Sequence, residues 1–335
     1  MEIDTSRSMG PSLVISLDFE LFWGVADSRT VAGYRDNIEG EWDAIPRILA
    51  LFRQYGVRAT WATVGMLMCR DHAQWRELRP SVLPGYVRKQ RSSYSLGKLA
   101  YEYPRLFFAR PLVEQILATP GQELATHTYS HFYCGEEGAT PEQFSADLAC
   151  AQIIASDMGA NCRSLVFPRN QVREEFVAVL PKAGIEVYRR NPDHWLYRNG
   201  HYVPGGMAGR MVRLADAWLP LTGTHVARVT IANGLVSVPA SLFLRPWPRR
   251  LAGLEFLRIA RLKQAMTAAA RCGGICHLWW HPHNFGVNTE QNLAVLESLL
   301  QHFVVLQDRH GMRSVQMGEA ADLTYPDALH AAHLR

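Results

Sequence analysis

Two acidic side chains directly follow an apolar run near the start of the chain. The run Leu13–Leu17 is typical of a buried strand, and Asp18 and Glu20 come immediately after it. Because residues i and i+2 of a strand point to the same side, both carboxylates should face one pocket. Two like charges in one pocket repel, and a bivalent metal ion would relieve that repulsion. The alternative is that the two residues simply start a loop and cap a helix.

A pair of histidines follows another strand candidate. His127 and His131 come after the run Glu123–Thr126, at positions i and i+4 of each other. On a helical turn this spacing puts both imidazoles on one face, which is the geometry that a zinc ion needs from two nitrogen ligands. Together with the carboxylates, the pair predicts a site for Zn²⁺ or another divalent transition metal.

Two further strand candidates end in residues that could assist a reaction. The strand Ile275–Trp280 is followed by His281, a candidate for proton transfer near neutral pH. Ser164–Phe167 is followed by Arg169, which could orient a nearby carboxylate or hold it ionised. A plain surface arginine is the alternative for Arg169.

A cysteine-rich zinc site competes with this interpretation. Cys272, Cys276 and His277 are soft zinc ligands that lie close together in the sequence. Their Cys-x-x-x-Cys spacing does not match the usual zinc knuckle, and no second cysteine pair lies nearby. We therefore favour the histidine and carboxylate set.

The elements that must position these residues alternate along the chain. Short apolar or β-branched runs alternate with stretches of helical period, which predicts a parallel sheet, open or closed into a barrel. The remaining expected elements are the strands Val57–Thr63 and Ile185–Tyr188 and helices near Trp42–Tyr55, Arg110–Ala118, Pro141–Met158, Glu174–Ala183 and Glu290–Gln307. Catalytic residues of α/β barrels lie where strands end, so we predict a distorted (β/α) barrel of about seven parallel strands.

One segment departs from this alternation. Arg228–Ile231 and Leu235–Val238 flank Asn233-Gly234, which is a strong hairpin signal. We therefore predict a β-hairpin insertion. Because no linker or repeat is evident, we expect a single catalytic domain over residues 1–335, with insertions at about 66–109, which is basic, and about 200–250.

Composition excludes several classes of protein. Of the 335 residues 48% are hydrophobic and 20% are charged, which rules out a disordered chain, a coiled coil and a small disulfide scaffold. Six cysteines in so long a chain fit a reducing compartment. No apolar run reaches the roughly 18–20 residues of a membrane span. The first ten residues are too polar for a signal peptide, so we expect a cytoplasmic protein.

The basic residues are concentrated in two stretches. Residues 70–98 and 243–271 carry net charges of +5 and +6, whereas the whole chain carries +4. This polarity suggests an anionic ligand or surface near those stretches, although two solvated surface segments are the alternative. The mixture of apolar and basic residues between Phe243 and Met266 suggests peripheral contact with the inner membrane surface or, as the alternative, a core-packed helix. We expect no nucleic acid partner.

Read in order, these strand ends resemble the polysaccharide deacetylase family (carbohydrate esterase family 4, which includes chitooligosaccharide deacetylases) over roughly residues 12–323. Thr126–His131 is the most specific piece, and Thr128 matches the hydroxyl that braces the histidine loop. The resemblance implies the roles of five residues, with Asp18 as catalytic base, Glu20, His127 and His131 as metal ligands, and His281 as general acid.

Three departures mark a divergent member. One residue separates Asp18 from Glu20, where the family has adjacent acids. Arg169 follows a proline, whereas the family's arginine, the partner of the base, precedes one. Trp279 stands where the family has a leucine.

The resemblance implies a reaction. We expect a water activated by zinc to attack the carbonyl of an N-acetyl group on a sugar, with Asp18 accepting a proton and His281 protonating the departing amine. The expected substrate is a nucleotide-linked or lipid-phosphate-linked sugar used in surface-polysaccharide biosynthesis. A catalytically silent member that binds carbohydrate or a partner protein is one alternative, and a deformylase or other amide hydrolase is another.

Aromatic residues near the strand ends are candidates for contact with the sugar. These residues are Phe22, Trp23, Trp195 and Trp280. Aromatic side chains at such positions could equally belong to the core. The sequence does not specify an oligomeric state.

Overall fold

Strands and helices alternate along the chain, as the apolar runs predict. The computed structural model describes residues 9–192, 194–197 and 206–324. The strands are β1 (Ser12–Phe19), β2 (Ala59–Thr63), β3 (Gln122–Thr126), β4 (Ser164–Leu165), β5 (Val187–Arg190), β6 (Thr230–Ala232), β7 (Leu235–Pro239), β8 (Leu242–Phe243), β9 (Ile275–Trp280) and β10 (Arg313–Val315). The helices are α1 (Val31–Gln54), α2 (His72–Glu77), α3 (Gly97–Glu102), α4 (Arg110–Ala118), α5 (Pro141–Asp157), α6 (Glu174–Val177), α7 (Gly206–Ala215), α8 (Glu255–Cys272), α9 (Thr289–His310) and α10 (Met317–Thr324). Most of the polar start of the chain and residues 198–205 of the second predicted insertion lie outside the described residues.

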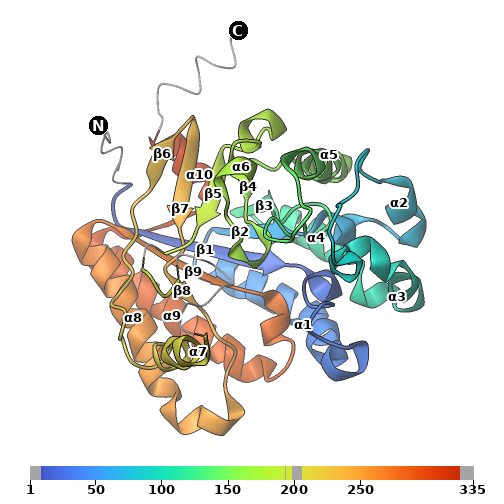
Figure 1. Ribbon diagram of the computed structural model, residues 1–335. Coiled ribbons are helices and arrows are strands. Elements are labelled where there is room, and N and C mark those ends of the chain that lie inside the picture. The colour runs from blue at the N-terminus through green and yellow to red at the C-terminus, as the bar shows by residue number, and fades with distance from the viewer. Residues whose placement is uncertain (1–8, 193, 198–205, 325–335) are drawn as a thin grey trace.

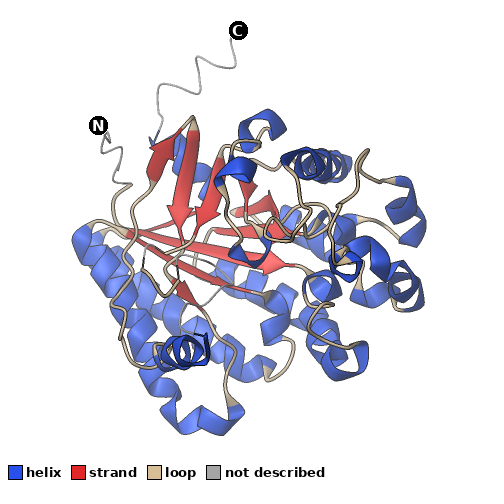
Figure 2. Ribbon diagram, viewed as in Figure 1, coloured by secondary structure: helices blue, strands red, loops and turns tan. Residues whose placement is uncertain are grey.

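The strands form one curled sheet at the centre of the molecule, with helices around it (Figures 1 and 2). Its order is β6-β7-β5-β4-β3-β2-β1-β9-β8, with β10 beside the first half of β1. All neighbouring strands run parallel except β6 and β7. The chain from 235 to 243 pairs first with β5 and then with β9, so it joins the two sides of the curl. The predicted (β/α) barrel is confirmed.

The hairpin predicted around Asn233-Gly234 is present as β6 and β7. Both turn residues have positive φ, 51° for Asn233 and 76° for Gly234, as a tight two-residue hairpin requires. The second strand, β7, also pairs parallel to β5. The hairpin is therefore built into the barrel wall, and residues 235–239 are not a simple insertion. The division of the chain into one domain with two insertions stays a prediction.

Alternation along the strands sorts side chains to the two faces of the sheet. On β1, Leu13, Ile15 and Leu17 belong to the large core between the sheet and the outer helices. Val14 instead belongs to a smaller cluster inside the barrel, which includes Ala62, Ala125, Val187, Val236 and Ile275. Residues of α10 join that inner cluster, so α10 covers the amino ends of the strands. The inner face becomes polar toward the carboxyl ends, at Ser16 and Asp18.

The helices pack on the outer face of the sheet. Helix α1 begins after the N-cap Thr30, well before the predicted Trp42, because the polar residues and glycines of its first turns hide the helical period. Helix α5 begins after the N-cap Thr140, whose side chain accepts a hydrogen bond from Gln143 N. Helix α8 packs against α9 and β9, which matches the core-packed alternative. Among the described residues, no helix combines the length and the apolar character that crossing a bilayer needs.

Candidate metal centre and active site

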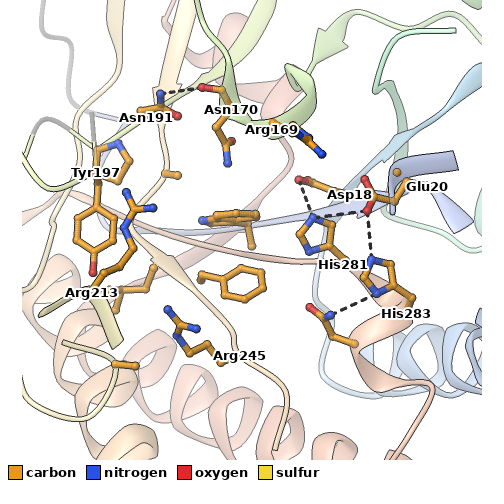
Figure 3. Close-up of a pocket in the computed structure, with 18 of the residues that line it drawn as sticks. Asp18, Glu20, Arg169, Asn170, Asn191, Tyr197, Arg213, Arg245, His281 and His283 are labelled. Carbon is orange, nitrogen blue, oxygen red and sulfur yellow. Dashed lines mark hydrogen bonds and ion pairs between the residues drawn. The ribbon is translucent and has the colours of Figure 1, made fainter. Parts of the chain in front are cut away.

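A cavity of about 450 Å³ opens at the carboxyl ends of the strands. Asp18, Glu20, His131 and His281 all line it, although they come from β1, from the loop after β3 and from the end of β9. Figure 3 shows Asp18, Glu20 and His281 side by side at one end of this cavity. The barrel thus brings the predicted strand ends to one place.

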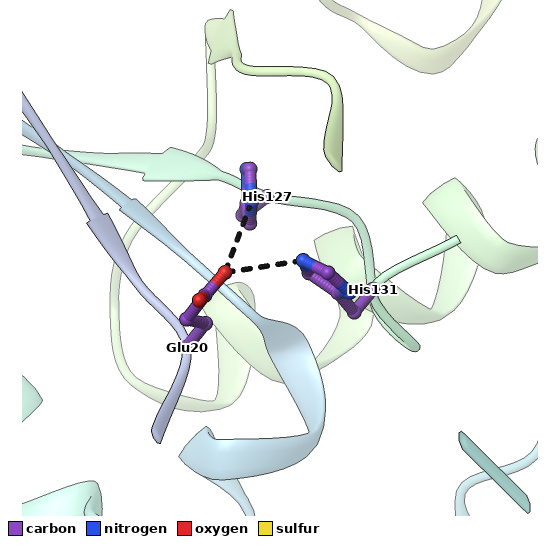
Figure 4. Close-up of side chains that lie close together, drawn as sticks. All are labelled: Glu20, His127 and His131. Atoms are coloured by element: carbon purple, nitrogen blue, oxygen red, sulfur yellow. Dashed lines mark ion pairs between the residues drawn. The ribbon is translucent and has the colours of Figure 1, made fainter. Parts of the chain in front are cut away.

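Glu20 and the two predicted histidine ligands converge on one point (Figure 4). Glu20 Oε2 lies 3.1 Å from His131 Nε2 and 3.6 Å from His127 Nε2. Two ligands that bind a tetrahedral zinc ion at 2.0–2.1 Å lie about 3.3 Å apart, so these separations fit a shared ion. All three side chains are buried. The donor set of one carboxylate and two imidazoles suits a divalent transition metal.

Backbone contacts fix the orientation of the histidine loop. His127 Nδ1 donates to the carbonyl oxygen of Val166 at 2.8 Å, which leaves the Nε2 lone pair directed toward Glu20. Thr128 Oγ1 accepts from Phe132 N at 2.7 Å and so braces the turn, as its position in the motif predicts. Thr128 and His131 both have positive φ, 64° and 54°. Their backbone conformation is uncommon for residues with a side chain, and the hydrogen bonds hold it.

Asp147 of α5 also fixes the histidine loop, through hydrogen bonds to its backbone. Its carboxylate accepts from the backbone N–H of Tyr129 at 2.7 Å and from that of Ser130 at 3.1 Å, and it also contacts the Ser130 hydroxyl. Asp147 is fully buried, and burial raises its pKa to about 6 although these donors favour the charged form. The sequence analysis missed this residue, because it lies in mid-helix with nothing in its spacing to mark it.

Glu20 is a buried carboxylate surrounded by imidazoles. Burial alone would raise its pKa, but His281, His127, His131 and His283 together hold that pKa well below its usual value. Gly24 leaves the room for this carboxylate, since a Cβ there would lie 2.0 Å from the Glu20 carboxyl carbon.

The other oxygen of Glu20 faces a second set of nitrogen donors. His283 Nε2 lies 3.2 Å from Glu20 Oε1, and His281 Nε2 lies 3.9 Å away. His283 Nδ1 in turn accepts from the Tyr34 hydroxyl at 2.9 Å when its Nε2 carries the proton. Glu20, His281 and His283 therefore form a second group of potential metal ligands that shares Glu20 with the first.

Asp18 is paired with an arginine that the sequence analysis did not single out. Arg189 of β5 makes two 2.7 Å contacts, from Nη1 to Asp18 Oδ1 and from Nη2 to Oδ2. Both side chains are almost fully buried. Burial alone would raise the pKa of Asp18, but Arg189 and His127 outweigh it and lower that pKa. The carboxylate is therefore held ionised, 3.9 Å from His281 Nε2.

A network of polar side chains next to this pair holds Arg189 in place. Its Nη1 also donates to Ser16 Oγ at 3.0 Å, and the Ser16 hydroxyl contacts His277 Nε2 at 2.8 Å. The guanidinium lies over the ring of Trp279, 4.4 Å from its centroid. Burial lowers the pKa of His277 to about 3, so the ring is neutral and accepts from Ser16. One feature of the sequence could have identified Arg189, because it is a charged residue directly after a predicted core strand.

The structure corrects the role implied for Arg169. Its guanidinium pairs with Asp27 and lies over the ring of Tyr133, 4.5 Å from the centroid. Arg169 lines the cavity, but the partner of Asp18 is Arg189. The physical reason is position, because Arg169 lies in a short turn beyond β4, with φ of 57°, where its guanidinium reaches Asp27, whereas Arg189 lies on β5 and reaches Asp18.

The cysteine alternative is contradicted within the described residues. Cys272 is exposed at the end of α8, whereas Cys276 is buried among outer core residues. His277 is on the opposite face of β9 and contacts Ser16. Strand alternation therefore separates these residues, and they form no metal-binding group.

None of the four predicted aromatic contacts lines the cavity. Phe22, Trp23 and Trp280 are almost fully buried in the outer core, and Trp195 is 51% exposed outside the cavity lining. The aromatic side chains that do line it are Tyr34, Tyr197, Phe243 and Trp279. For Trp280 the prediction was wrong about which face of β9 the side chain occupies. Successive strand residues point to opposite faces, and Trp279 faces the cavity whereas Trp280 packs outward in the core.

Comparison with known proteins agrees with this fold. The curled parallel sheet has the architecture of a (β/α) barrel, with a candidate Glu-His-His metal site at the carboxyl ends of its strands. Residues 35–188 match the family model described as polysaccharide deacetylase, so this part of the chain is similar to that family. The matched segment contains His127 and His131, whereas Asp18, Glu20 and His281 lie outside it. No curated protein matches the sequence significantly.

Solved structures share the fold at low sequence identity. A Mycobacterium smegmatis protein assigned as a polysaccharide deacetylase is 14% identical, with a TM-score of 0.57 over 95% of this chain and 91% of that one. A Pseudomonas aeruginosa PAO1 protein with the same assignment is 13% identical, with a TM-score of 0.56 over 96% and 93%. The PuuE allantoinase is 12% identical, with a TM-score of 0.55 over 96% and 92%.

Proposed function

We propose that this protein is a metal-dependent amide hydrolase that removes an N-acetyl group from a sugar or sugar precursor used in surface-polysaccharide biosynthesis. The observation that carries the proposal is the convergence of Glu20, His127 and His131 beside the Asp18–Arg189 pair and His281 in one cavity. Similarity to the polysaccharide deacetylase family supports the N-acetyl sugar as substrate. A cytoplasmic location stays a prediction.

Glu20, His127 and His131 would hold the ion. Glu20 Oε2 lies 3.1 and 3.6 Å from the two histidine nitrogens, which fits a shared ion, whereas His281 Nε2 lies 3.9 Å from both Glu20 Oε1 and Asp18 Oδ2. When bound, a divalent ion there would supply Lewis acidity for the amide carbonyl and lower the pKa of a water molecule. We assign zinc as the first candidate, because imidazole and carboxylate ligands suit it.

Asp18 would act as the general base. Arg189 holds its carboxylate ionised and fixed, and two hydrogen bonds from that guanidinium leave further lone pairs on the oxygens to accept a proton. The carboxylate lines the cavity beside Glu20, where an attacking water would lie. Asp18 would take the proton of that water as the new bond to the carbonyl carbon forms.

His281 would act as the general acid. Its side chain is 24% exposed to the cavity, more than that of Asp18 or Glu20. His281 follows β9, which pairs directly with β1. His283 stacks on it, with ring centroids 5.0 Å apart, and fixes its orientation. His281 would protonate the departing amine as the carbon–nitrogen bond breaks.

An acetate-release assay tests the proposal. Zinc-loaded protein is incubated with a panel of N-acetylated sugars, and free acetate and formate are both measured. Asp18→Asn or His281→Ala should lower turnover by roughly 10²–10⁴-fold with metal retained. His310→Ala, an exposed histidine at the end of α9, is the matched control and should keep full activity.

The same assay separates the alternatives. Formate release from N-formylated sugars without acetate release would assign a deformylase on the same residues. Carbohydrate binding with neither product, across substrates and divalent metals, would contradict the hydrolase and leave a binding protein. The intact Asp18–Arg189 and His281 arrangement favours hydrolysis.

A further inference from the structure

The cavity has a second end that the proposed chemistry does not use. Away from Glu20 it is lined by Arg213 of α7, Arg245 after β8, and Arg258 and Arg261 of α8. Figure 3 shows Arg213 and Arg245 at the end opposite Asp18 and Glu20. One cavity therefore joins a candidate metal centre to a group of guanidinium side chains.

Two of these arginines are neutralised by neighbouring carboxylates. Arg258 Nε donates to Glu255 at 2.9 Å, in a pair that is largely buried. Arg261 Nη2 contacts Asp216 at 2.7 Å, and Asp216 also accepts from the hydroxyl of Tyr197. The Arg261–Asp216 pair holds α8 against the segment 216–223, whereas the Arg258–Glu255 pair lies within α8. Both pairs account for the charges of their arginines within the protein.

Arg245 differs, because no carboxylate of the described chain pairs with its guanidinium. Its guanidinium carbon lies over the ring of Phe243, 5.9 Å from the ring centroid. The side chain is partly buried, and burial together with the positive charge of Arg258 lowers its pKa. Tyr197 and Asp216 oppose this shift, but neither forms an ion pair with Arg245. Removing a cation from water without a paired carboxylate is costly, so an anionic ligand would stabilise this arrangement.

Arg213 lies close enough to Arg245 for the two charges to interact. Arg213 donates to the carbonyl oxygen of Leu196 at 2.6 Å and lies over the ring of Tyr197 at 4.6 Å. The positive charge of Arg245 contributes to a lowered pKa of Arg213, although burial is the larger cause. Two neighbouring guanidinium groups match the several oxygens of a phosphate better than the two of a carboxylate.

An aromatic wall separates the two ends. The rings of Phe243 and Trp279 lie 4.6 Å apart, and the Phe243 ring is 5.7 Å from that of His281. Both aromatic residues line the cavity, so an apolar sugar face would contact them between the metal centre and Arg245. A sugar whose N-acetyl group lies at Glu20 would direct a distant substituent toward the arginines.

The other basic stretch of the sequence does not contribute. Arg88 and Arg91 fold against Glu136 and Asp27, and no basic residue between positions 70 and 98 lines the cavity. The suggestion that both stretches face an anionic ligand therefore narrows to the second one.

We propose that the arginine-lined end binds a phosphate group carried by the sugar substrate, with Arg245 as its principal cation and Arg213 beside it. The proposal rests on the proposed function, because the N-acetyl group is taken to occupy the metal end. It makes the substrate class an N-acetylated sugar phosphate, either nucleoside diphosphate-linked or polyprenyl phosphate-linked.

Calorimetric titration tests the phosphate site without relying on turnover. Zinc-loaded full-length protein carrying Asp18→Asn is titrated with N-acetylglucosamine and with N-acetylglucosamine 1-phosphate. We expect the phosphate to strengthen binding at least about tenfold, and Arg245→Gln to remove that gain without weakening binding of the neutral sugar. Arg245→Lys should recover part of it. Arg250→Gln, an exposed arginine outside the cavity lining, is the control and should keep it.

Further arms identify the source of the phosphate. Uridine diphosphate N-acetylglucosamine and a short polyprenyl phosphate-linked N-acetylglucosamine are titrated in the same way, and the tighter of the two identifies the carrier. Equal affinity for neutral and phosphorylated sugars, or a phosphate gain that survives Arg245→Gln, would overturn the proposal. A gain seen only with an N-acetylated sugar carboxylate would also overturn it.

The two proposals fail in different ways. Phosphate-dependent binding through Arg245 with no acetate released by the wild-type protein would leave the phosphate site standing and refute the hydrolase. Acetate release from neutral oligosaccharides, with no effect of phosphate or of Arg245→Gln, would do the reverse.

Discussion

At the scale of single residues, the proposed chemistry depends on how buried charges are paired. Asp18 lies inside the barrel only because Arg189 supplies two hydrogen bonds and a counter-charge. The pair is in turn held by Ser16 and Asn170, which accept from the same guanidinium at 3.0 and 2.9 Å. Such a pair is costly to break from one side, since the remaining charge stays buried.

Arg189→Met should therefore destabilise the fold by roughly 3–5 kcal/mol, because Asp18 remains as an unpaired buried carboxylate. Denaturant unfolding of metal-free protein measures the loss. The double variant Asp18→Asn, Arg189→Met should recover much of that stability, since neither charge is left. A double variant no more stable than Arg189→Met alone would show that the ion pair does not dominate the effect.

Five residues of the site were visible in the sequence for one physical reason. Asp18, His127 and His281 directly follow a predicted strand, and Glu20 and His131 come shortly after the first two. Parallel strands bring such positions to one edge. Arg189 follows the predicted strand Ile185–Tyr188 and lies near the end of β5, which carries two consecutive arginines, so the sequence did not show which of the two points inward.

At the scale of elements, two helices set the positions of the site loops. The first half of α1 touches the turn Pro282–Phe285 and Gly286 that follow His281. A Cβ on Gly40 would lie 1.9 Å from the carbonyl oxygen of Gly286, so helix and loop are in backbone contact. Asn37 Nδ2 also donates to the carbonyl of His283 at 3.3 Å.

Gly40→Ala should displace the loop that carries His281 and His283. Turnover should fall by on the order of 10²-fold, because a displacement of about 1 Å is enough to misalign a proton donor. The zinc content should stay unchanged, since Glu20, His127 and His131 lie outside the displaced loop. Steady-state acetate release and metal analysis measure the two effects. Gly253→Ala is the control, because nothing lies within 4 Å of a Cβ there. Full activity in Gly40→Ala would refute the positioning role of α1.

Helix α5 supports the histidine loop through Asp147, whose pKa is raised to about 6 by burial. The folded protein therefore holds the proton more tightly than the unfolded chain, where the pKa is near 3.8. It follows that the contribution of Asp147 to stability is greatest below about pH 4 and is lost as the pH rises through about 6.

The free energy of unfolding of the wild-type protein, relative to Asp147→Asn, should thus fall by at most about 3 kcal/mol between pH 4 and pH 6.5. Denaturant titrations of both proteins in a chelator measure this difference, because the asparagine does not titrate. A difference that stays flat or rises over that range would mean that the hydrogen bonds from Tyr129 and Ser130 outweigh burial.

Elements were easier to predict from the sequence than the contacts between them. The core strands follow from apolar runs, and α5 follows from its capping residues. The backbone contact between Gly40 and Gly286 has no local signal, because it joins residues 246 positions apart. The sequence also did not show which face of a strand some side chains occupy. In the pair Trp279-Trp280 both residues are aromatic, so no alternation of polar and apolar residues indicates which ring faces inward.

At the scale of the whole molecule, a closed barrel turns separate strand ends into one cavity with two chemical ends. The residues 235–243 matter here, because they join β5 to β9 and continue directly to Arg245. The alternation of strands and helices in the sequence predicted the barrel. It did not predict that β7 and β8 would pair with β5 and β9, because no pattern within residues 235–243 specifies these partners. The arginine-lined end of the cavity depends on this pairing and was therefore not predicted.

Metal binding should stabilise the entire fold, because the ligands come from segments more than 100 residues apart and the unfolded chain cannot bring them together. Zinc at 100 times its dissociation constant should add about 2.7 kcal/mol to the free energy of unfolding. Thermal unfolding with and without zinc measures this gain. His131→Ala should abolish it and the surface variant His310→Ala should keep it, whereas an equal gain in all three proteins would point to a site elsewhere.

The most direct test of the account is X-ray absorption at the zinc edge of protein loaded with one equivalent of zinc. The account predicts a shell of nitrogen and oxygen ligands at about 2.0–2.2 Å with two imidazoles, and one imidazole fewer in His127→Ala. A sulfur shell at about 2.3 Å, an unchanged spectrum in His127→Ala, or zinc that is lost on dialysis would contradict a centre built from Glu20, His127 and His131.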